Sequence, residues 1–254
     1  MRLTASLALL ALLCGSWATA APLKLCFENV AQAPWTMPDA SGLNFELLRR
    51  VEKLTGEQFQ FHARPWIRCM EETRTGAMDA MIGAADSPER RLFSRLPILP
   101  DGRANPDKAL YEDRVDVFLR EGSGAAWDGK DLVNPRAIAV AQRGYFVGDL
   151  LRARGQSVID NIKSAEEGLR VLAAGSADVA VLLGRSAEKM VQDDPRFAGR
   201  ITLAPQPFTQ FAFYLMVGRK TYAANPARIE AIWNAIATVR IQPDYRKLEA
   251  AATH

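Results

Sequence analysis

The sequence predicts an α/β fold of two lobes, each a mainly parallel sheet flanked by helices, and three observations indicate it. Apolar, strand-like runs alternate with helix-like segments along most of the chain, and this order produces parallel sheets. The order breaks at Gly122-Ser123-Gly124 and then starts again. A Gly-x-x-Asp step joins a helix to a strand in both halves, at 76–79 and 175–178. Glycine suits the end of a helix, and aspartate suits the turn before a strand.

Hydrophobic spacing and turn residues define the elements of the first half. Leu47, Leu48, Val51 and Leu54 repeat at helical spacing before a glycine, and further on Ser87-Pro88-Glu89 predicts a helix start, with serine as the cap. A proline- and glycine-containing loop is expected at 99–108. In chain order we expect strands at 23–27, 58–62, 80–82 and 115–119, and helices at 47–55, 67–75 and from residue 88 onward.

The second half repeats this order of elements. Ser164-Ala165-Glu166-Glu167 matches a capping box, and Asn225-Pro226 starts a helix that carries apolar residues at helical spacing. In chain order we expect strands at 137–141, 179–183 and 211–217, and helices at 147–153, 164–174, from residue 225 and, briefly, from residue 243.

The N-terminus predicts a secretory signal peptide over residues 1–20. An apolar run, Leu7–Cys14, follows Met1-Arg2 and leads into the small residues Ala18-Thr19-Ala20. The run is too short for a membrane span, which needs about 20 apolar residues. Cleavage is expected after Ala20, because a cut one residue later would leave proline at the new N-terminus. The mature chain is therefore expected in the periplasm.

The chain has three cysteines. Cys14 belongs to the predicted signal, and it is a poor lipidation site because Leu13 stands where a small residue is usual. Cys26 and Cys69 remain as an even pair in an oxidising compartment, which favours a disulfide between them. Two buried free thiols are the alternative.

Charge and motif content exclude several classes of protein. The formal net charge is +3 at pH 7, which argues against a nucleic-acid partner, and a soluble monomer is expected. The chain contains only two histidines, His62 and His254, so a histidine-based metal site or catalytic triad is not expected. Phosphate-loop, dinucleotide and nucleophile-elbow motifs are missing from the sequence. We therefore expect no catalytic residue and no cofactor.

Two tryptophans and an arginine lie near the ends of predicted strands. Trp35 follows the first strand, Trp66 follows the second, and Arg90 lies in the first turn of the helix capped by Ser87. Ligands of α/β sheets bind beyond the carboxyl ends of the strands. Aromatic faces hold apolar or cationic groups, and the guanidinium fork matches a carboxylate. Core packing and a solvated surface arginine are the alternatives.

Several short stretches, in order and with similar spacing, are shared with a known family. From Leu23 to about Lys247 the chain resembles the bacterial extracellular solute-binding proteins of family 3, the periplasmic components of polar amino-acid transporters. The stretches are Pro34-Trp35, Gly42–Leu48, Gly76–Ala80, Ser87–Arg90, Phe93-Ser94, Ala174–Asp178 and Pro243-Asp244-Tyr245.

The resemblance implies a two-lobed, type II periplasmic-binding-protein fold with two crossing hinge segments. Lobe 1 would comprise 21–113 plus 213–254 and lobe 2 would comprise 114–212, with the hinge near Arg114 and Phe213. By the same resemblance Arg90 would bind a ligand carboxylate, Trp66 and Trp35 would stack on the ligand, Gly83 would offer backbone contacts, and Gly144-Tyr145 would form an anion-binding turn.

The chain departs from the family pattern at the ammonium-binding position. Leu183 and Gly184 stand where an acidic residue is usual, and Ala85 replaces a hydroxyl residue near the arginine. Glu28 and Glu46 are the candidates to supply the missing charge. We therefore expect a small carboxylate-bearing polar ligand, an amino acid or a related compound.

The expected function is capture of this ligand by hinged closure, for delivery to an ABC permease in the inner membrane. A ligand-sensing module for a membrane receptor is one alternative. A periplasmic enzyme resembling the cyclohexadienyl dehydratases is another, although the adjacent acidic pair Glu71-Glu72 does not form a facing acid/base pair on a helix.

Overall fold

The computed structural model describes residues 21–253. The predicted signal peptide and its cleavage site lie outside the described residues. Within 21–253, none of the helices combines the length and the apolar character needed to cross a membrane.

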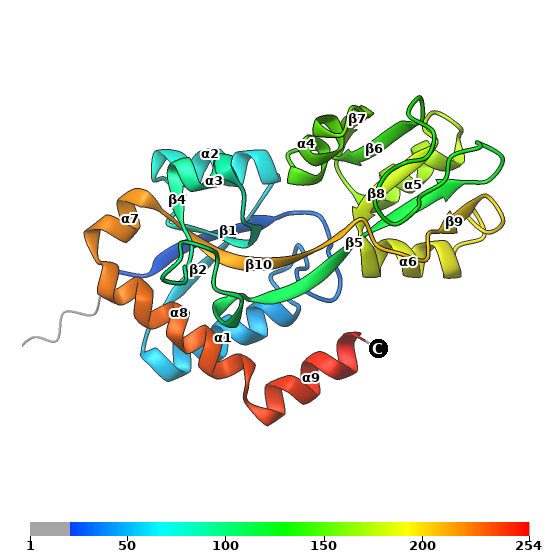
Figure 1. The fold of residues 1–254 in the computed structure, drawn as a ribbon. Helices are drawn as coiled ribbons and strands as arrows, with labels where there is room; N and C mark the ends of the chain where they lie inside the picture. Colours follow the sequence, from blue (N-terminus) through cyan, green and yellow to red (C-terminus); the bar gives the residue numbers. More distant parts are fainter. Residues whose placement is uncertain (1–20, 254) are drawn as a thin grey trace, which may run out of the picture.

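One ten-stranded sheet runs through two lobes, in the order β2-β1-β3-β10-β5-β8-β6-β7 (Figure 1). β1 pairs parallel with β2 and β3 in the first lobe, and β6 pairs parallel with β7 and β8 in the second. The predicted mainly parallel lobes are therefore confirmed. The strands are β1 (Leu23–Glu28), β2 (Phe59–Arg64), β3 (Ala80–Ala85), β4 (Ser94–Arg95), β5 (Tyr111–Arg120), β6 (Ile138–Gln142), β7 (Ser157–Ile162), β8 (Val179–Leu183), β9 (Ile201–Leu203) and β10 (Thr209–Gly218).

Two long antiparallel strands, β5 and β10, join the lobes. Their register runs from Tyr111 opposite Phe213 to Val115 opposite Thr209, and Figure 1 shows both strands passing from one lobe to the other. They lie where the hinge was predicted, near Arg114 and Phe213. The division of the chain at residues 113 and 213 stays a prediction.

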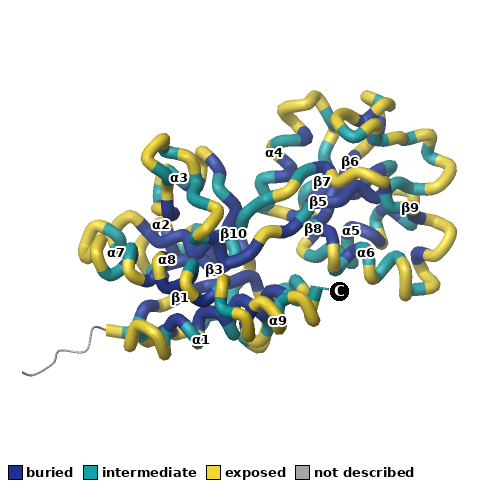
Figure 2. The backbone as a smooth tube through the Cα atoms, turned by 60° about the horizontal axis from the view of Figure 1, so that its bottom comes forward, coloured by how far each residue is buried: buried dark blue, intermediate teal, exposed yellow. Residues whose placement is uncertain are grey.

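The first lobe buries both faces of its sheet. Alternate residues of a strand point to opposite faces, so Leu25 and Phe27 pack in a core with α1 and α8, whereas Cys26 packs with α2. Figure 2 shows the buried strands between helices whose outer faces are exposed. The helices are α1 (Leu43–Thr55), α2 (Trp66–Thr75), α3 (Pro88–Phe93), the 3-10 turn η1 (Pro106–Lys108), α7 (Arg219–Ala224), α8 (Pro226–Arg240) and α9 (Pro243–Thr253).

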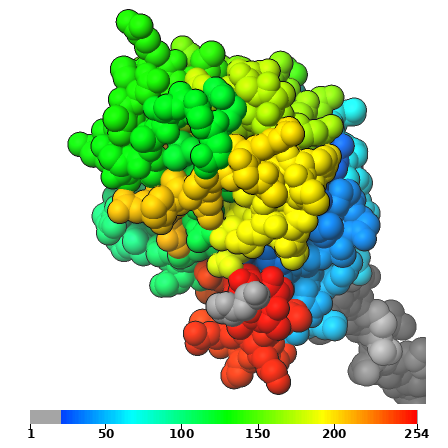
Figure 3. All heavy atoms as spheres, turned by 90° about the vertical axis from the view of Figure 1, so that its right-hand side faces the viewer, coloured from blue at the N-terminus to red at the C-terminus, as the bar shows by residue number. Residues whose placement is uncertain are grey.

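The second lobe has the same layering. Val140 and Leu182 pack with α5 on one face, and Val117 and Ala139 pack with α4 on the other. Its helices are α4 (Phe146–Ala153), α5 (Ala165–Ala173) and α6 (Gly184–Asp193). Figure 3 shows α9, the last helix of the chain, beside the segment that contains α6. There the Arg185 guanidinium donates a hydrogen bond to the Thr253 carbonyl oxygen.

The predicted helix starts are confirmed by capping hydrogen bonds. The Ser87 hydroxyl accepts from the Arg90 amide at 3.3 Å, and the Ser164 hydroxyl accepts from the Glu167 amide at 3.1 Å. A side-chain cap of this kind is worth about 1 kcal/mol. The sequence missed β7, α6, α7 and the short strands β4 and β9. It also placed the first helix four residues too late.

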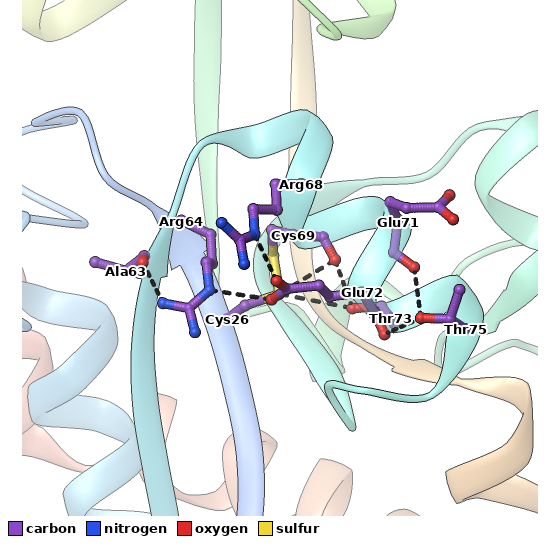
Figure 4. Close-up of polar contacts among 9 residues, drawn as sticks. All are labelled: Cys26, Ala63, Arg64, Arg68, Cys69, Glu71, Glu72, Thr73 and Thr75. Carbon is purple, nitrogen blue, oxygen red and sulfur yellow. Dashed lines mark hydrogen bonds and ion pairs between the residues drawn. A yellow bond between two sulfur atoms is a disulfide. The ribbon is translucent and has the colours of Figure 1, made fainter.

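The structure joins Cys26 of β1 to Cys69 of α2 in a disulfide, which supports the predicted pair. The bond ties the sheet to the helix whose surface carries Glu72, which is 3.0 Å from Arg64 and 2.6 Å from Arg68 (Figure 4). The two cysteines are 43 residues apart. Closing a loop of this length restricts the unfolded chain substantially.

We predict that the double variant C26S/C69S loses about 4 kcal/mol of unfolding free energy, by the chain-entropy relation for this loop. For a chain of this size the melting temperature would fall by about 8–16 °C. Thermal melts with and without reductant measure the effect. An unchanged melting temperature, together with two alkylatable thiols in the native protein, would contradict the bond.

Candidate ligand-binding site

A cavity lies between the lobes, against the two strands that join them. Its wall takes residues from both lobes and from both joining strands, so a molecule in it would touch both lobes and the strands between them. The lining residues are Glu28, Gln32, Trp66, Ile82, Gly83, Ala85, Arg90, Val115, Tyr145, Phe146, Val147, Leu183, Phe211 and Phe213.

Arg90 is the positive group of this cavity. The Ser87 cap starts α3 directly after β3 and sets Arg90 in the first turn, where only 5% of the residue is exposed. Its guanidinium donates to the Ala85 carbonyl oxygen at 2.8 Å and to the Gly144 carbonyl oxygen, from the other lobe, at 3.2 Å. The guanidinium carbon lies 5.3 Å from the centre of the Trp66 ring.

No carboxylate within residues 21–253 forms an ion pair with Arg90. Burial lowers the pKa of Arg90 to about 10, so the side chain is still charged at pH 7. An arginine has five N–H donors, and two carbonyl oxygens cannot satisfy them all. A buried guanidinium in this state is suited to an anionic ligand.

Tyr145 brings the second lobe onto the first. It precedes α4 of the second lobe, yet it packs against the core cluster of the first lobe that contains Trp66. Its hydroxyl accepts a hydrogen bond from the Gln32 side-chain amide. The neighbouring Gly144 also packs closely against the first lobe. Its φ is +76°, and a Cβ atom at this position would lie only 3.0 Å from Cγ1 of Ile67 on α2.

Glu28 is the acidic group of the cavity. It ends β1 and is 6% exposed. Burial raises its pKa to about 7, although hydrogen bonds from nearby backbone amides, including that of Trp66, act in the opposite direction. Glu28 is therefore only partly ionised at neutral pH.

Comparison with solved structures establishes the fold. A histidine kinase sensor domain with similarity to periplasmic binding proteins matches with a TM-score of 0.73 at 16% identity, over 92% of this chain and 96% of that one. The protein has a periplasmic-binding-protein fold. An ancestral amino-acid-binding protein, a precursor of cyclohexadienyl dehydratase, matches at 0.70 and 14% identity over 92% and 95% of the two chains. The substrate-binding protein of an amino acid ABC transporter matches at 0.69 and 13% identity over 91% and 99%.

No protein-family model matches the sequence, and no curated protein matches it. These three solved structures are less than 20% identical to this chain in sequence. They show its fold and do not identify its ligand.

Most of the residues predicted for ligand binding meet at the cavity. Glu28, Trp66, Gly83, Arg90 and Tyr145 line it, and Gly144 contributes the carbonyl oxygen bound to Arg90. Glu46, the other candidate for an acidic contact, lies on α1 in an ion pair with Arg50 at 2.9 Å and does not line the cavity.

Trp35 lies outside the lining of this cavity. Its indole N–H donates to Asp113 at 2.9 Å, and its ring stacks on Tyr111, with centroids 4.3 Å apart. Tyr111 in turn stacks on Phe213 at 4.7 Å, and Phe213 lines the cavity. Trp35 therefore packs behind the cavity wall through Tyr111. Together with Asp113 it also lines a smaller neighbouring pocket.

Gln32 and the apolar residues of the wall were not among the residues predicted from the sequence. Phe211 and Phe213 alternate along β10 and face the cavity. That alternation was visible in the sequence, but it indicates only that one face of the strand is buried. Gln32 lies in the loop after β1, and no local pattern marks it.

We predict that Glu28→Gln stabilises the protein increasingly as pH rises. Between pH 4.5 and about 7 the unfolded chain releases a proton that the buried carboxyl keeps, so the wild-type free energy of unfolding falls with pH. Glutamine removes this dependence. The difference should reach on the order of 2 kcal/mol at pH 8 and vanish near pH 4.5.

Urea unfolding at pH 4.5, 6 and 8 measures this difference. The exposed Glu89→Gln on α3 is the matched control and should show no pH-dependent gain. Equal pH dependence in wild type and Glu28→Gln would contradict the raised pKa of Glu28.

Proposed function

We propose that the protein captures a small carboxylate-bearing ligand between its lobes and that Arg90 binds the carboxylate. The observation that carries the proposal is the state of Arg90. It is buried and charged, it has no carboxylate partner within residues 21–253, and it lines a cavity formed by both lobes. A ligand carboxylate would complete its hydrogen bonding.

Capture proceeds by hinged closure about β5 and β10. A ligand in the cavity touches Arg90 and Trp66 on one lobe and Tyr145 on the other, so it binds the closed arrangement better than any open one. Such differential contact shifts the population toward the closed form. The cross-lobe hydrogen bonds of Arg90 to Gly144 and of Gln32 to Tyr145 stabilise the same arrangement.

The closed form is then the species that a membrane partner recognises. We infer that the chain is exported to the periplasm as a monomer and delivers its ligand to an ABC permease. The predicted signal peptide and the family resemblance support this assignment. A complex of the liganded protein with permease, absent without ligand, would test it. Stimulation of a receptor instead would favour sensing.

We infer binding without chemical conversion. The ionisable side chains of the cavity wall are Glu28, Arg90 and Tyr145, and Arg90 and Tyr145 are already engaged in contacts between the lobes. Turnover of prephenate or arogenate by the purified protein would contradict this inference.

We predict that Arg90→Gln weakens ligand binding by about 100-fold or more, since breaking a buried charge pair costs about 3–5 kcal/mol. The ligand is first found by a thermal-shift screen of carboxylates, because a bound ligand raises the melting temperature. Calorimetry then gives the affinities. Arg95→Gln, at an exposed arginine of β4, is the control. Unchanged affinity in a folded Arg90→Gln protein would refute the role of Arg90.

We predict that Gly144→Ala impairs closure and weakens binding up to about tenfold, or roughly 1.4 kcal/mol. The added methyl group would press on Ile67 and Trp66, at 3.0 and 3.3 Å. Gly155→Ala is a matched control, because Gly155 has a similar φ of +80° but no neighbour within 4 Å. Both variants should lose stability from the strained positive φ, and Gly144→Ala should lose more because of its added contacts.

Small-angle scattering with and without ligand separates the two glycine variants. Ligand should compact the wild type and Gly155→Ala alike and compact Gly144→Ala less. Equal affinity and equal compaction in both variants would show that the Gly144 contact plays no part in closure.

A further inference from the structure

Most of the cavity wall around Arg90 and Glu28 is apolar. Val115 comes from β5, Phe211 and Phe213 from β10, Leu183 from the end of β8, and Phe146 from α4. Apolar side chains offer no hydrogen bonds, so a polar substituent facing them would lose water without replacement. This wall fits a ligand with an apolar body.

The solute-binding family that this chain resembles binds a ligand ammonium group at the position of Leu183 and Gly184. This chain has no acidic side chain there. Leu183 pairs with Val115 in the β5–β8 register, and both side chains line the cavity. A Cβ atom on Gly184 would lie 2.2 Å from Oδ2 of Asp116 and 2.9 Å from Cγ of Arg114. Any side chain at 184, acidic ones included, would therefore require Asp116 and Arg114 to shift.

Asp116 does not take over this role. Successive side chains of a strand point to opposite faces, so Asp116 lies on the face of β5 away from Val115. Its Oδ2 is 2.8 Å from Nε of Arg114, and it does not line the cavity. Within residues 21–253, Glu28 is the single carboxylate in the lining. It ends β1 and is 6% exposed, so burial disfavours its charged form.

We propose that the ligand is a small monocarboxylate with an apolar body and without an ammonium group, such as a branched aliphatic or aryl-substituted acid. The inference rests on the proposed function, because its carboxylate is the group that Arg90 binds. The body packs against the apolar wall. An ammonium group that faced Leu183 and Val115 would lose its water without gaining a hydrogen-bond acceptor from these two side chains.

Calorimetry on the purified protein with matched pairs of acids tests the proposal. The pairs are 4-methylpentanoate with leucine and 3-phenylpropanoate with phenylalanine, which differ only by the ammonium group. Glutamate and arginine serve as polar probes. Each acid without an ammonium group should bind about tenfold or more tightly than its amino-acid partner, the size expected for an unpaired buried polar group. Tighter binding of leucine, phenylalanine or either polar probe would overturn the inference.

A charge placed at Leu183 should reverse the preference. Leu183 is the N-cap of α6 and makes no capping hydrogen bond, and aspartate and asparagine are both favoured caps, so both variants are expected to fold. Leu183→Asp should shift the preference toward the amino acid by about tenfold, because a charged hydrogen bond becomes available. The uncharged Leu183→Asn should leave the ratio within about twofold. Equal ratios in the two variants would also overturn the inference.

The outcomes separate this inference from the capture function. A polar amino acid that binds and compacts the protein would overturn the ligand class proposed here and leave capture between the lobes standing. If no carboxylate of any kind binds or compacts the protein, the role of Arg90 and the ligand class fail together.

Discussion

The antiparallel pairing of β5 with β10 is the constraint on which the rest of the structure depends. It continues one sheet through both lobes, so the lobes are connected by hydrogen-bonded strands and not by loose linkers. The same strands supply Val115, Phe211 and Phe213 to the cavity. Any bending of the pair therefore changes the position of the lobes and the shape of the ligand wall together.

A buried arginine whose N–H groups lack partners lowers the stability of the fold unless other groups accept those hydrogen bonds. Here part of the compensation comes from the Ala85 carbonyl, and part comes across the cavity from Gly144. The second contact exists only when the lobes meet. Arg90 thus favours the arrangement in which the lobes meet, and under the proposed function a ligand carboxylate would add further hydrogen bonds to it.

The sequence predicted the fold where the signals are local. The Ser87 cap and the strand before it placed Arg90 correctly beyond a strand end, and the alternation of strands and helices gave the two lobes. Prediction from the sequence failed where contacts between distant residues determine the position of a side chain. Trp35 was expected at the ligand, but its partner Asp113 lies 78 residues away. α6 begins directly after β8, without the turn that would have marked it, and Glu28 could be separated from Glu46 only by their burial in the folded chain.

Gly184 packs closely against the side chains of the joining strand β5. Asp116 and Arg114 of β5 fill the space that a side chain at 184 would need, and Arg114 also bonds Glu188 of α6. These charges hold α6 against the hinge strand on the face away from the cavity. The side chains that pack α6 against β5 therefore occupy the space beside Gly184. Leu183, one residue earlier, already lines the cavity, so a carboxylate introduced there would not need to displace Asp116 or Arg114.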